Sequence, residues 1–150
     1  MTNFRCSCPI TSGIDVLGDK WTLVLIKQML IENFKTFKEF TESNESISTN
    51  ILSQRLKHMQ ELGLIFRTNQ PKNKKSNLYL LTEKGLKLIP LIMELTIWSS
   101  DNLREEHPTM DYDENLEFVK NNKEEAYILI AEKYKEKTGY NNGNRCATHY

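Results

Sequence analysis

The chain has 150 residues, of which 39% are hydrophobic and 27% are charged, so it is long enough for one domain with a buried core. Its 20 Lys and Arg residues balance 20 Asp and Glu residues, and this net charge of zero gives by itself no sign of a nucleic-acid partner. No apolar run is long enough to span a bilayer, and no apolar segment of a signal peptide follows Arg5. The three cysteines make an odd number, which argues against a disulfide framework. We therefore expect a reduced cytoplasmic protein without a membrane partner.

The charge is divided unevenly along the chain. Residues 1–100 carry thirteen basic and nine acidic residues, whereas residues 101–150 carry seven and eleven. The basic excess is densest between Ile65 and Lys87, where six basic residues stand against the single acid Glu83. A local basic segment of this kind has to be judged where it is concentrated.

The first predicted helix begins near Pro9 and Ser12 and ends near Asn33. Its apolar residues recur at helical spacing, at Ile14, Leu17, Trp21, Val24, Leu25 and Met29. A second, short helix follows, with Thr36 as its N-cap and Phe37 and Phe40 on its inner face.

A polar turn over residues 42–46 leads into a third helix over residues 49–62, which Gly63 ends. One face of this helix is apolar, with Leu52, Leu56, Met59 and Leu62, and the other is small and polar, with Asn50, Ser53, Gln54 and Lys57. Two helices joined by a polar turn, the second with a polar outer face, are typical of a helix-turn-helix.

The next segment reads as a β-hairpin. Residues 64–68 and 78–81 form its strands, and residues 70–77 form a turn that holds Lys72, Lys74 and Lys75. Thr82 is expected to cap a long helix that reaches about residue 102, with Pro90 as a site for a kink.

The remainder of the chain is acidic and less apolar. We expect a break at His107-Pro108, a helix that begins with capping-box spacing at Asn122 and Glu125, and a loose tail over residues 138–150. The predicted fold class is mainly α with a two-stranded β-wing (α+β), a winged helix-turn-helix with additional C-terminal helices. The predicted domains are residues 1–103, which bind DNA and dimerise, and residues 104–150, an acidic helical extension and tail.

In these residues the chain resembles the HxlR family of bacterial winged-helix regulators. The matching pieces are Cys8-Pro9, DVLGDKWTLVLI at residues 15–26, TFKEF at 36–40, ISTNILSQRLKHMQELGLI at 47–65, YLLTEKG at 79–85, and Trp98. The resemblance implies a homodimer on an operator with two-fold symmetry, with the first helix and the helices after the wing in the dimer interface. The extension after Asn102 is longer than is usual in the family, and Cys6 and Cys146 are additions to the family-like Cys8.

The candidate DNA-binding residues lie on the third helix and in the wing. On the helix they are Ser48, Thr49, Asn50, Ser53, Gln54 and Lys57, because Asn and Gln can pair with adenine and Ser with several base edges. Lys72, Lys74 and Lys75 suit phosphate contacts. The alternatives are a solvated helix face and a solubilising turn. Arg55 lies closer to the apolar stripe, where a structural role is at least as well supported as a phosphate contact.

Cys8, with Cys6 and Cys146 as candidate resolving thiols, is the second candidate site. A thiol before a helix N-terminus can have a lowered pKa, and the resemblance implies sensing of oxidants or electrophiles, whereas the alternative is an inert small side chain. A zinc site from Cys6, Cys8, Cys146 and His149 has an unfavourably tight first spacing, so we predict no metal and no cofactor.

No catalytic motif is present: the sequence has no phosphate-binding Gly loop, no nucleophile elbow and no His-Glu-x-x-His pattern. We therefore expect no enzyme, and a thiol enzyme remains only a formal alternative. The favoured function is a sequence-specific regulator that binds double-stranded DNA as a homodimer and responds to an oxidant or small-molecule effector. A winged-helix protein-interaction module, whose acidic C-terminal part masks the basic face, stays open as the alternative.

Overall fold

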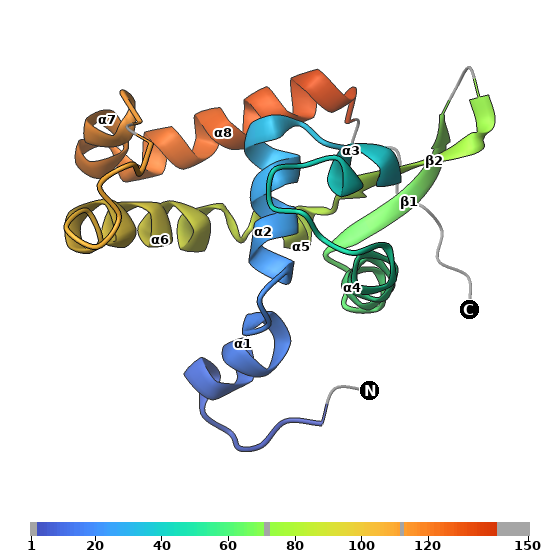
Figure 1. Ribbon diagram of the computed structural model, residues 1–150, viewed down its shortest axis with the longest axis horizontal. Coiled ribbons are helices and arrows are strands. Elements are labelled where there is room, and N and C mark those ends of the chain that lie inside the picture. Colours follow the sequence, from blue (N-terminus) through green and yellow to red (C-terminus); the bar gives the residue numbers. More distant parts are fainter. Residues whose placement is uncertain (1–2, 71–72, 112, 141–150) are drawn as a thin grey trace. The chain divides into compact units, whose positions relative to one another are not determined.

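A computed structural model describes residues 3–70, 73–111 and 113–140 of the chain (Figure 1). Two units make up the chain, Met1–Thr82 and Glu83–Tyr150. The elements are helices apart from one two-stranded antiparallel sheet in the first unit, which confirms the predicted fold class. Among the described helices, none combines the length and the apolar character that crossing a membrane requires.

The N-terminal helical region is interrupted. It consists of α1 (Pro9–Leu17), α2 (Thr22–Lys27) and a π-helical turn, η1 (Gln28–Glu32). The prediction of one continuous helix was wrong, because the apolar periodicity continues across a break at residues 18–21. The predicted end at Asn33 was right: this residue has the left-handed φ of 59° that commonly ends a helix.

Both helices of the predicted helix-turn-helix are present. In α3 (Phe37–Thr41), Thr36 is the N-cap, as predicted, and it also forms a capping box with Glu39. The second helix, α4 (Thr49–Glu61), begins at its N-cap Ser48, and the chain turns at Gly63 with a φ of 69°.

The hairpin consists of β1 (Ile65–Gln70) and β2 (Asn73–Leu81), which pair from Ile65↔Leu81 to Asn69↔Asn77, with an irregularity between Asn69 and Gln70. The predicted strands were in the right places but too short, and Lys74 and Lys75 belong to a strand instead of the turn. Lys and Asn have weak strand propensity, so the backbone pairing that extends the ladder is not visible in the local sequence.

The core of the first unit is formed by side chains from α2, η1, α3, α4 and the two strands. The helix α4 contributes the predicted stripe and lies against α3 and β1. The fully or almost fully buried side chains include Leu25, Ile26, Met29, Phe40, Leu52, Leu56 and Met59, together with Ile65 and Leu81 of the strands. This packing keeps the opposite face of α4 at the surface.

The second unit contains α5 (Glu83–Leu86), α6 (Ile89–Asn102), α7 (Leu116–Asn121) and α8 (Lys123–Thr138). One long helix from Thr82 was predicted, and this was wrong. The helix is divided before Ile89, and Pro90 lies in the first turn of α6, where its missing N–H costs no helical hydrogen bond. The Thr82 hydroxyl, just before α5, donates to the carbonyls of Gly63 and Leu64, at 2.6 and 3.2 Å.

Polar contacts join α8 to α6, and Figure 1 shows the two helices running side by side. Lys123 Nζ lies 2.5 Å from Glu94 Oε1, and the Tyr127 hydroxyl donates to the same oxygen at 3.2 Å. The predicted capping role of the Asn122 side chain was wrong, because its amide donates back to the Phe118 carbonyl at 3.2 Å.

Candidate nucleic-acid interface

The outer face of α4 carries the polar residues that the sequence singled out. Leu52, Leu56 and Met59 are buried on the inner face of the helix. The exposed side chains on the outer face are those of Thr49, Asn50, Ser53, Gln54 and Lys57. The structure thus brings five of the six candidate residues of this helix onto one accessible surface.

Ser48, the sixth candidate, is the N-cap residue of α4. Its hydroxyl oxygen accepts a hydrogen bond from the backbone N–H of Ile51 at 3.4 Å, and its side chain remains exposed. A residue at this position fixes where the helix begins and hence which residues form its first turn. In helix-turn-helix proteins these first residues are the ones that reach base edges.

Ile51 belongs to the same outer face, although the sequence analysis did not name it. Its side chain is 39% exposed. An exposed apolar side chain beside Asn50 and Gln54 suits contact with the methyl group of thymine. The signal was available, because Ile51 falls outside the helical stripe of Leu52 and Leu56.

Arg55 is tied to the start of α2, in agreement with the structural role considered above. Its Nη1 lies 3.3 Å from Oδ2 of Asp19, and both side chains are largely buried. The same carboxylate accepts hydrogen bonds from the N–H groups of Trp21 and Thr22 at 2.8 and 3.0 Å, and from the Thr22 hydroxyl. Burial alone would raise the pKa of Asp19, but these hydrogen bonds and the nearby guanidinium lower it, so the carboxylate stays charged.

The wing lysines are only partly described. Lys72 lies outside the described residues, and Lys74 and Lys75 have a described backbone in β2 but no described side chains. Figure 1 shows the β1–β2 hairpin projecting from the body of the first unit. A basic hairpin that projects in this way has the reach that phosphate contacts need.

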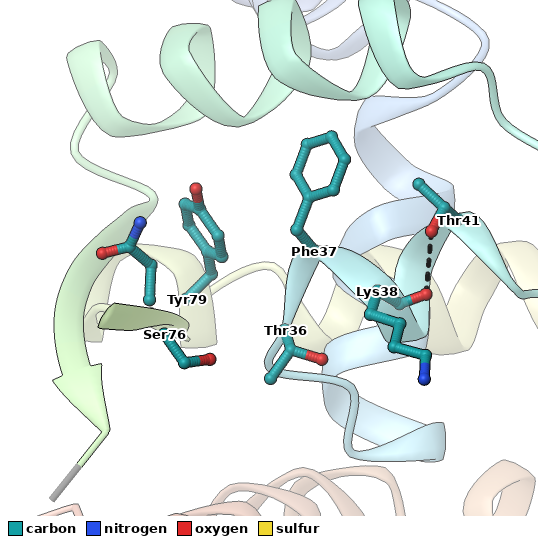
Figure 2. A pocket seen from close by; sticks show the side chains of 7 residues that line it. Thr36, Phe37, Lys38, Thr41, Ser76 and Tyr79 are labelled. Carbon is teal, nitrogen blue, oxygen red and sulfur yellow. Dashed lines mark hydrogen bonds between the residues drawn. The ribbon is translucent and has the colours of Figure 1, made fainter. Parts of the chain in front are cut away.

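An open groove of about 500 Å³ lies between α3 and β2 (Figure 2). Phe37 and Tyr79 point to the same side of it, while hydroxyl, amide and ammonium groups supply its polar lining. Its lining residues are Thr36, Phe37, Lys38, Thr41, Ser76, Asn77 and Tyr79. The sequence did not reveal this groove, because its two walls are about forty positions apart and share no local pattern.

The N-terminal thiols lie apart from these surfaces in the chain. Cys6 and Cys8 are both free and exposed, and Cys8 is the N-cap residue of α1. The N–H and the hydroxyl of Thr11, together with the N–H of Ile10, lower the pKa of the Cys8 thiol. The backbone N–H of Arg5 donates to Asp15 at 3.2 Å, which ties this segment to α1.

A metal site is not formed by the part of the chain that the structure describes, where no three His, Cys, Asp or Glu side chains are suitably grouped. The predicted partner thiol Cys146 lies outside the described residues, as does His149. The zinc hypothesis on Cys6, Cys8, Cys146 and His149 therefore stays untested.

The comparison with protein families identifies this arrangement. A model of the HxlR-like helix-turn-helix family matches residues 16–107, more than half of the chain. The chain belongs to the HxlR-like family. The matched residues include all of α2, α3, α4, both strands of the wing and α6, whereas α7 and α8 lie beyond the match.

Relatives of this HxlR-like chain are named as transcriptional regulators. The HTH-type transcriptional regulator YodB of Bacillus subtilis is 33% identical over 93 residues, which cover 61% of this chain and 82% of YodB. The reduced form of the redox regulator HypR is 30% identical, with a TM-score of 0.55 over 63% of this chain and 93% of HypR. A structure of quinone-bound YodB from B. subtilis is 29% identical, with a TM-score of 0.52 over 63% of this chain and 99% of YodB.

Proposed function

We propose that the protein is a transcriptional regulator that binds double-stranded DNA sequence-specifically, with the outer face of α4 as its reading surface. The observation that carries this proposal is the set of exposed polar side chains on the second helix of a helix-turn-helix. Membership of a family whose named relatives are transcriptional regulators supports it. A partner of this kind implies that the protein acts in the cytoplasm, where bacterial DNA lies.

Each residue type on this surface has a distinct expected contact. Asn50 and Gln54 can form paired hydrogen bonds with adenine, Ser53 can bond to several base edges, and Ile51 can pack on a thymine methyl group. We expect the lysines to contact phosphate groups: Lys57 on α4, and Lys72, Lys74 and Lys75 in the wing. Lys38 in the groove beside β2 joins this group.

We further propose that the protein works as a homodimer on an inverted repeat. On α6, Leu91, Leu95 and Trp98 are 44%, 48% and 55% exposed, and their spacing places them on one face of the helix. Ile10 and Ile14 on α1 are also exposed. Covering such residues with a second copy gains about 25 cal/mol for each Å² of apolar surface removed from water. In this proposal residues 1–103 bind DNA and dimerise, and residues 104–150 are an extension.

A thiol switch is the third part of the proposal. An exposed thiol with a lowered pKa can be oxidised by a hydroperoxide to a sulfenic acid, with release of an alcohol or water. Condensation of that group with the thiol of Cys6 or Cys146 would release water and form a disulfide. Two of the similar structures support a thiol switch by their names, the redox regulator HypR and quinone-bound YodB.

Binding titrations with two variants test the reading surface. Gln54→Ala should lower the preference for the operator over unrelated DNA, because it removes a base contact worth about 1–3 kcal/mol. Lys74→Ala should weaken binding to all sequences by similar factors, and the exposed Lys133 on α8 supplies a control, Lys133→Ala, without effect. Unchanged operator affinity in both test variants would show that the assigned surface is wrong. A wild-type chain without any sequence preference would favour the protein-interaction module.

The thiol switch is tested by the same titration with reduced protein and with protein treated briefly with a thiol oxidant. We expect operator binding by the wild type to change on oxidation and to recover on reduction. In a Cys8→Ser variant, oxidation should leave operator binding unchanged. Binding that is indifferent to oxidation would leave the regulator in place without a sensor.

A further inference from the structure

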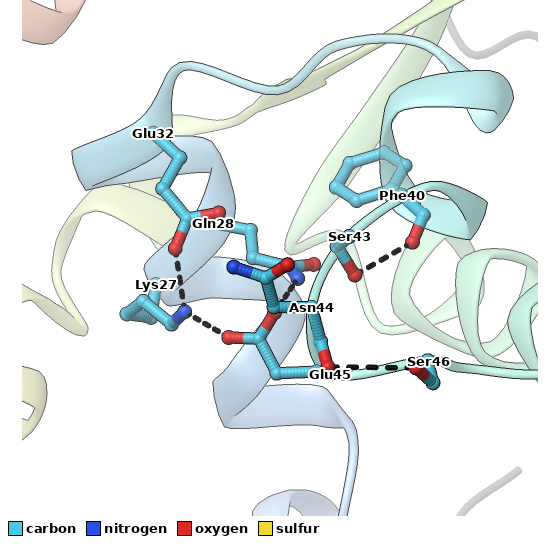
Figure 3. A network of polar contacts seen from close by, with 8 residues as sticks. All are labelled: Lys27, Gln28, Glu32, Phe40, Ser43, Asn44, Glu45 and Ser46. Atoms are coloured by element: carbon cyan, nitrogen blue, oxygen red, sulfur yellow. Dashed lines mark hydrogen bonds and ion pairs between the residues drawn. The ribbon is translucent and has the colours of Figure 1, made fainter.

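A polar network joins the end of α2 and the start of η1 to the turn between α3 and α4 (Figure 3). Lys27 Nζ donates to Glu32 at 2.6 Å and also to Oε1 of Glu45. The amide Nε2 of Gln28 donates to the other carboxylate oxygen of Glu45 at 2.8 Å. Two consecutive residues of the first helical region therefore hold both oxygens of one carboxylate in the helix-turn-helix turn.

Gln28 is an unusual residue for its position. Its side chain is 1% exposed, yet its Oε1 is buried without a hydrogen-bond partner among the residues that the structure describes. A buried acceptor that loses water and gains no donor lowers the free energy of unfolding, and an apolar residue of similar size would avoid this cost. The stability of the core therefore does not account for a glutamine here, whereas its hydrogen bond to Glu45 does.

Glu45 lies in the turn shortly before the start of α4. Only Ser46 and the buried Ile47 separate it from Ser48, the N-cap residue of α4. Burial alone would raise the pKa of Glu45, but the contacts with Lys27 and Gln28 lower it, so the carboxylate stays ionised at neutral pH. A Glu45 side chain that is held in place restricts the movement of its own backbone, which leads directly into α4.

The other end of α2 holds α4 by a second polar contact. Asp19, which accepts from the first N–H groups of α2, lies 3.3 Å from the guanidinium of Arg55 in the middle of α4. The segment from Asp19 to Gln28 thus contacts α4 itself at Arg55, and it contacts the turn before α4 at Glu45. Two separated points constrain the orientation of a helix, whereas one point would still allow it to rotate.

We propose that Gln28 and Lys27 are positioning residues for DNA recognition: by holding Glu45, they set the orientation of α4 that base contacts require. This inference rests on the proposed function, since it names what aligns that same surface. Phosphate contacts tolerate small displacements, because ammonium groups on long side chains can follow them, whereas paired hydrogen bonds to base edges do not. The network should therefore affect specific binding far more than non-specific binding.

The decisive variant is Gln28→Met, which keeps the length and approximate volume of the side chain and removes both polar atoms. We expect its unfolding midpoint to equal or exceed that of the wild type, its operator affinity to fall about tenfold, and its affinity for unrelated DNA to stay the same. Glu45→Gln should lose the charge interaction with Lys27 and show a smaller effect in the same direction. Glu132→Gln, which neutralises an exposed carboxylate on α8 outside the proposed DNA-binding surface, is the control and should bind like the wild type.

Amide hydrogen exchange without DNA provides a second, independent measurement. In Gln28→Met the amides of residues 43–48 should exchange faster than in the wild type, while those of the buried stretch of α4 do not change. Unchanged exchange together with unchanged operator affinity would overturn the proposal. The proposal would also be overturned if Gln28→Met lost stability, specific DNA binding and non-specific DNA binding together, because this is the result expected for a residue that only packs in the core.

The exchange measurement also keeps this proposal separate from the proposed function. If the wild type prefers no DNA sequence, the proposed function fails, and with it the role in recognition, while exchange still decides whether Gln28 holds the turn. If Gln28→Met does not fold, Glu45→Gln takes its place. Amide exchange and operator affinity equal to those of the wild type in Glu45→Gln would then overturn the proposal.

Discussion

Ser46 adopts a left-handed backbone conformation, with a φ of 56°, in the turn that leads into α4. Residues with a Cβ atom are strained in this region, and glycine is not. The strain lies next to Glu45, which the network of Lys27 and Gln28 holds in place. The turn that leads into α4 thus combines a strained residue with a carboxylate that two side chains hold.

Replacing this serine by glycine should stabilise the protein. We expect Ser46→Gly to raise the free energy of unfolding by about 0.5–1 kcal/mol, because the strained conformation costs glycine nothing, although glycine also gains freedom in the unfolded chain. Urea denaturation measures the difference. Ser46→Ala is the control and should give no gain, since alanine has the same Cβ atom; equal stability of the two variants would contradict the interpretation.

The Cys8 thiol should ionise more easily than an ordinary cysteine. In a chain that carries Cys6→Ser and Cys146→Ser, the rate of alkylation by iodoacetamide should rise with pH to a midpoint below 9.0, the ordinary value. The sign follows from Thr11 and Ile10, whose donors favour the thiolate and lower its pKa. Thr11→Val, which removes only the hydroxyl, should shift the midpoint back toward 9.0; a wild-type midpoint at or above that value would remove the basis for a reactive thiol.

At the scale of elements, the two helices of the helix-turn-helix, α3 and α4, each begin at a residue whose side chain caps the helix. Oε2 of Glu39 accepts the N–H groups of Lys35 and Thr36 at 2.8 and 2.7 Å, and the Thr36 hydroxyl accepts the N–H of Glu39 at 3.3 Å. Burial alone would raise the pKa of Glu39, but these donors lower it. The short helix α3 depends on this cap because five residues cannot sustain a helix alone.

Glu39→Ala should therefore lower the free energy of unfolding by about 1 kcal/mol near neutral pH. Because the folded pKa of Glu39 lies below the ordinary 4.5, its contribution is complete above that pH and is lost as the pH falls through the folded pKa. Denaturation curves at several pH values should show the variant and the wild type converging in acid. Glu42→Ala, at the other end of α3, is the control, and a difference for Glu39→Ala that does not vary with pH would contradict the cap.

The elements that the sequence predicted well carry local signals. In α4 a regular apolar stripe, the cap at Ser48 and Gly63 agree, so both the helix and its exposed face were predictable. The break before α2 was missed because apolar periodicity runs through it, although Asp19, which accepts from the N–H groups of Trp21 and Thr22, is a local signal for a new helix start. The groove between α3 and β2 and the contact of Gln28 with Glu45 join distant residues, and no local pattern encodes such pairs.

At the scale of the whole molecule, charge is divided unevenly along the chain. Met1–Thr82 contains eleven Lys and Arg against seven Asp and Glu, whereas Glu83–Tyr150 contains nine against thirteen. The neutral total thus combines a basic unit that contains the candidate DNA-binding surface with an acidic unit that bears an exposed apolar stripe on α6. This division fits DNA binding by the first unit and self-association through the second.

Self-association should depend on the stripe of Leu91, Leu95 and Trp98. We expect Trp98→Ala to raise the dimer dissociation constant at least about tenfold, because a large aromatic side chain at the centre of an interface typically contributes about 2 kcal/mol or more. Sedimentation velocity over a range of concentrations measures the change. Ile128→Ala, which removes a similarly exposed apolar side chain from α8, is the control; a wild type that stays monomeric at high concentration would contradict the dimer.

The central claim, that this protein reads DNA sequence, is tested most directly by selection. The wild-type protein would be incubated with fragments of the bacterial genome at moderate salt, and the retained fragments would be sequenced. We expect enrichment of one inverted repeat, with half-site centres about 10 base pairs or a multiple of this apart, and loss of that enrichment with Gln54→Ala. Retention of fragments without a shared sequence, or of no fragments at all, would contradict it.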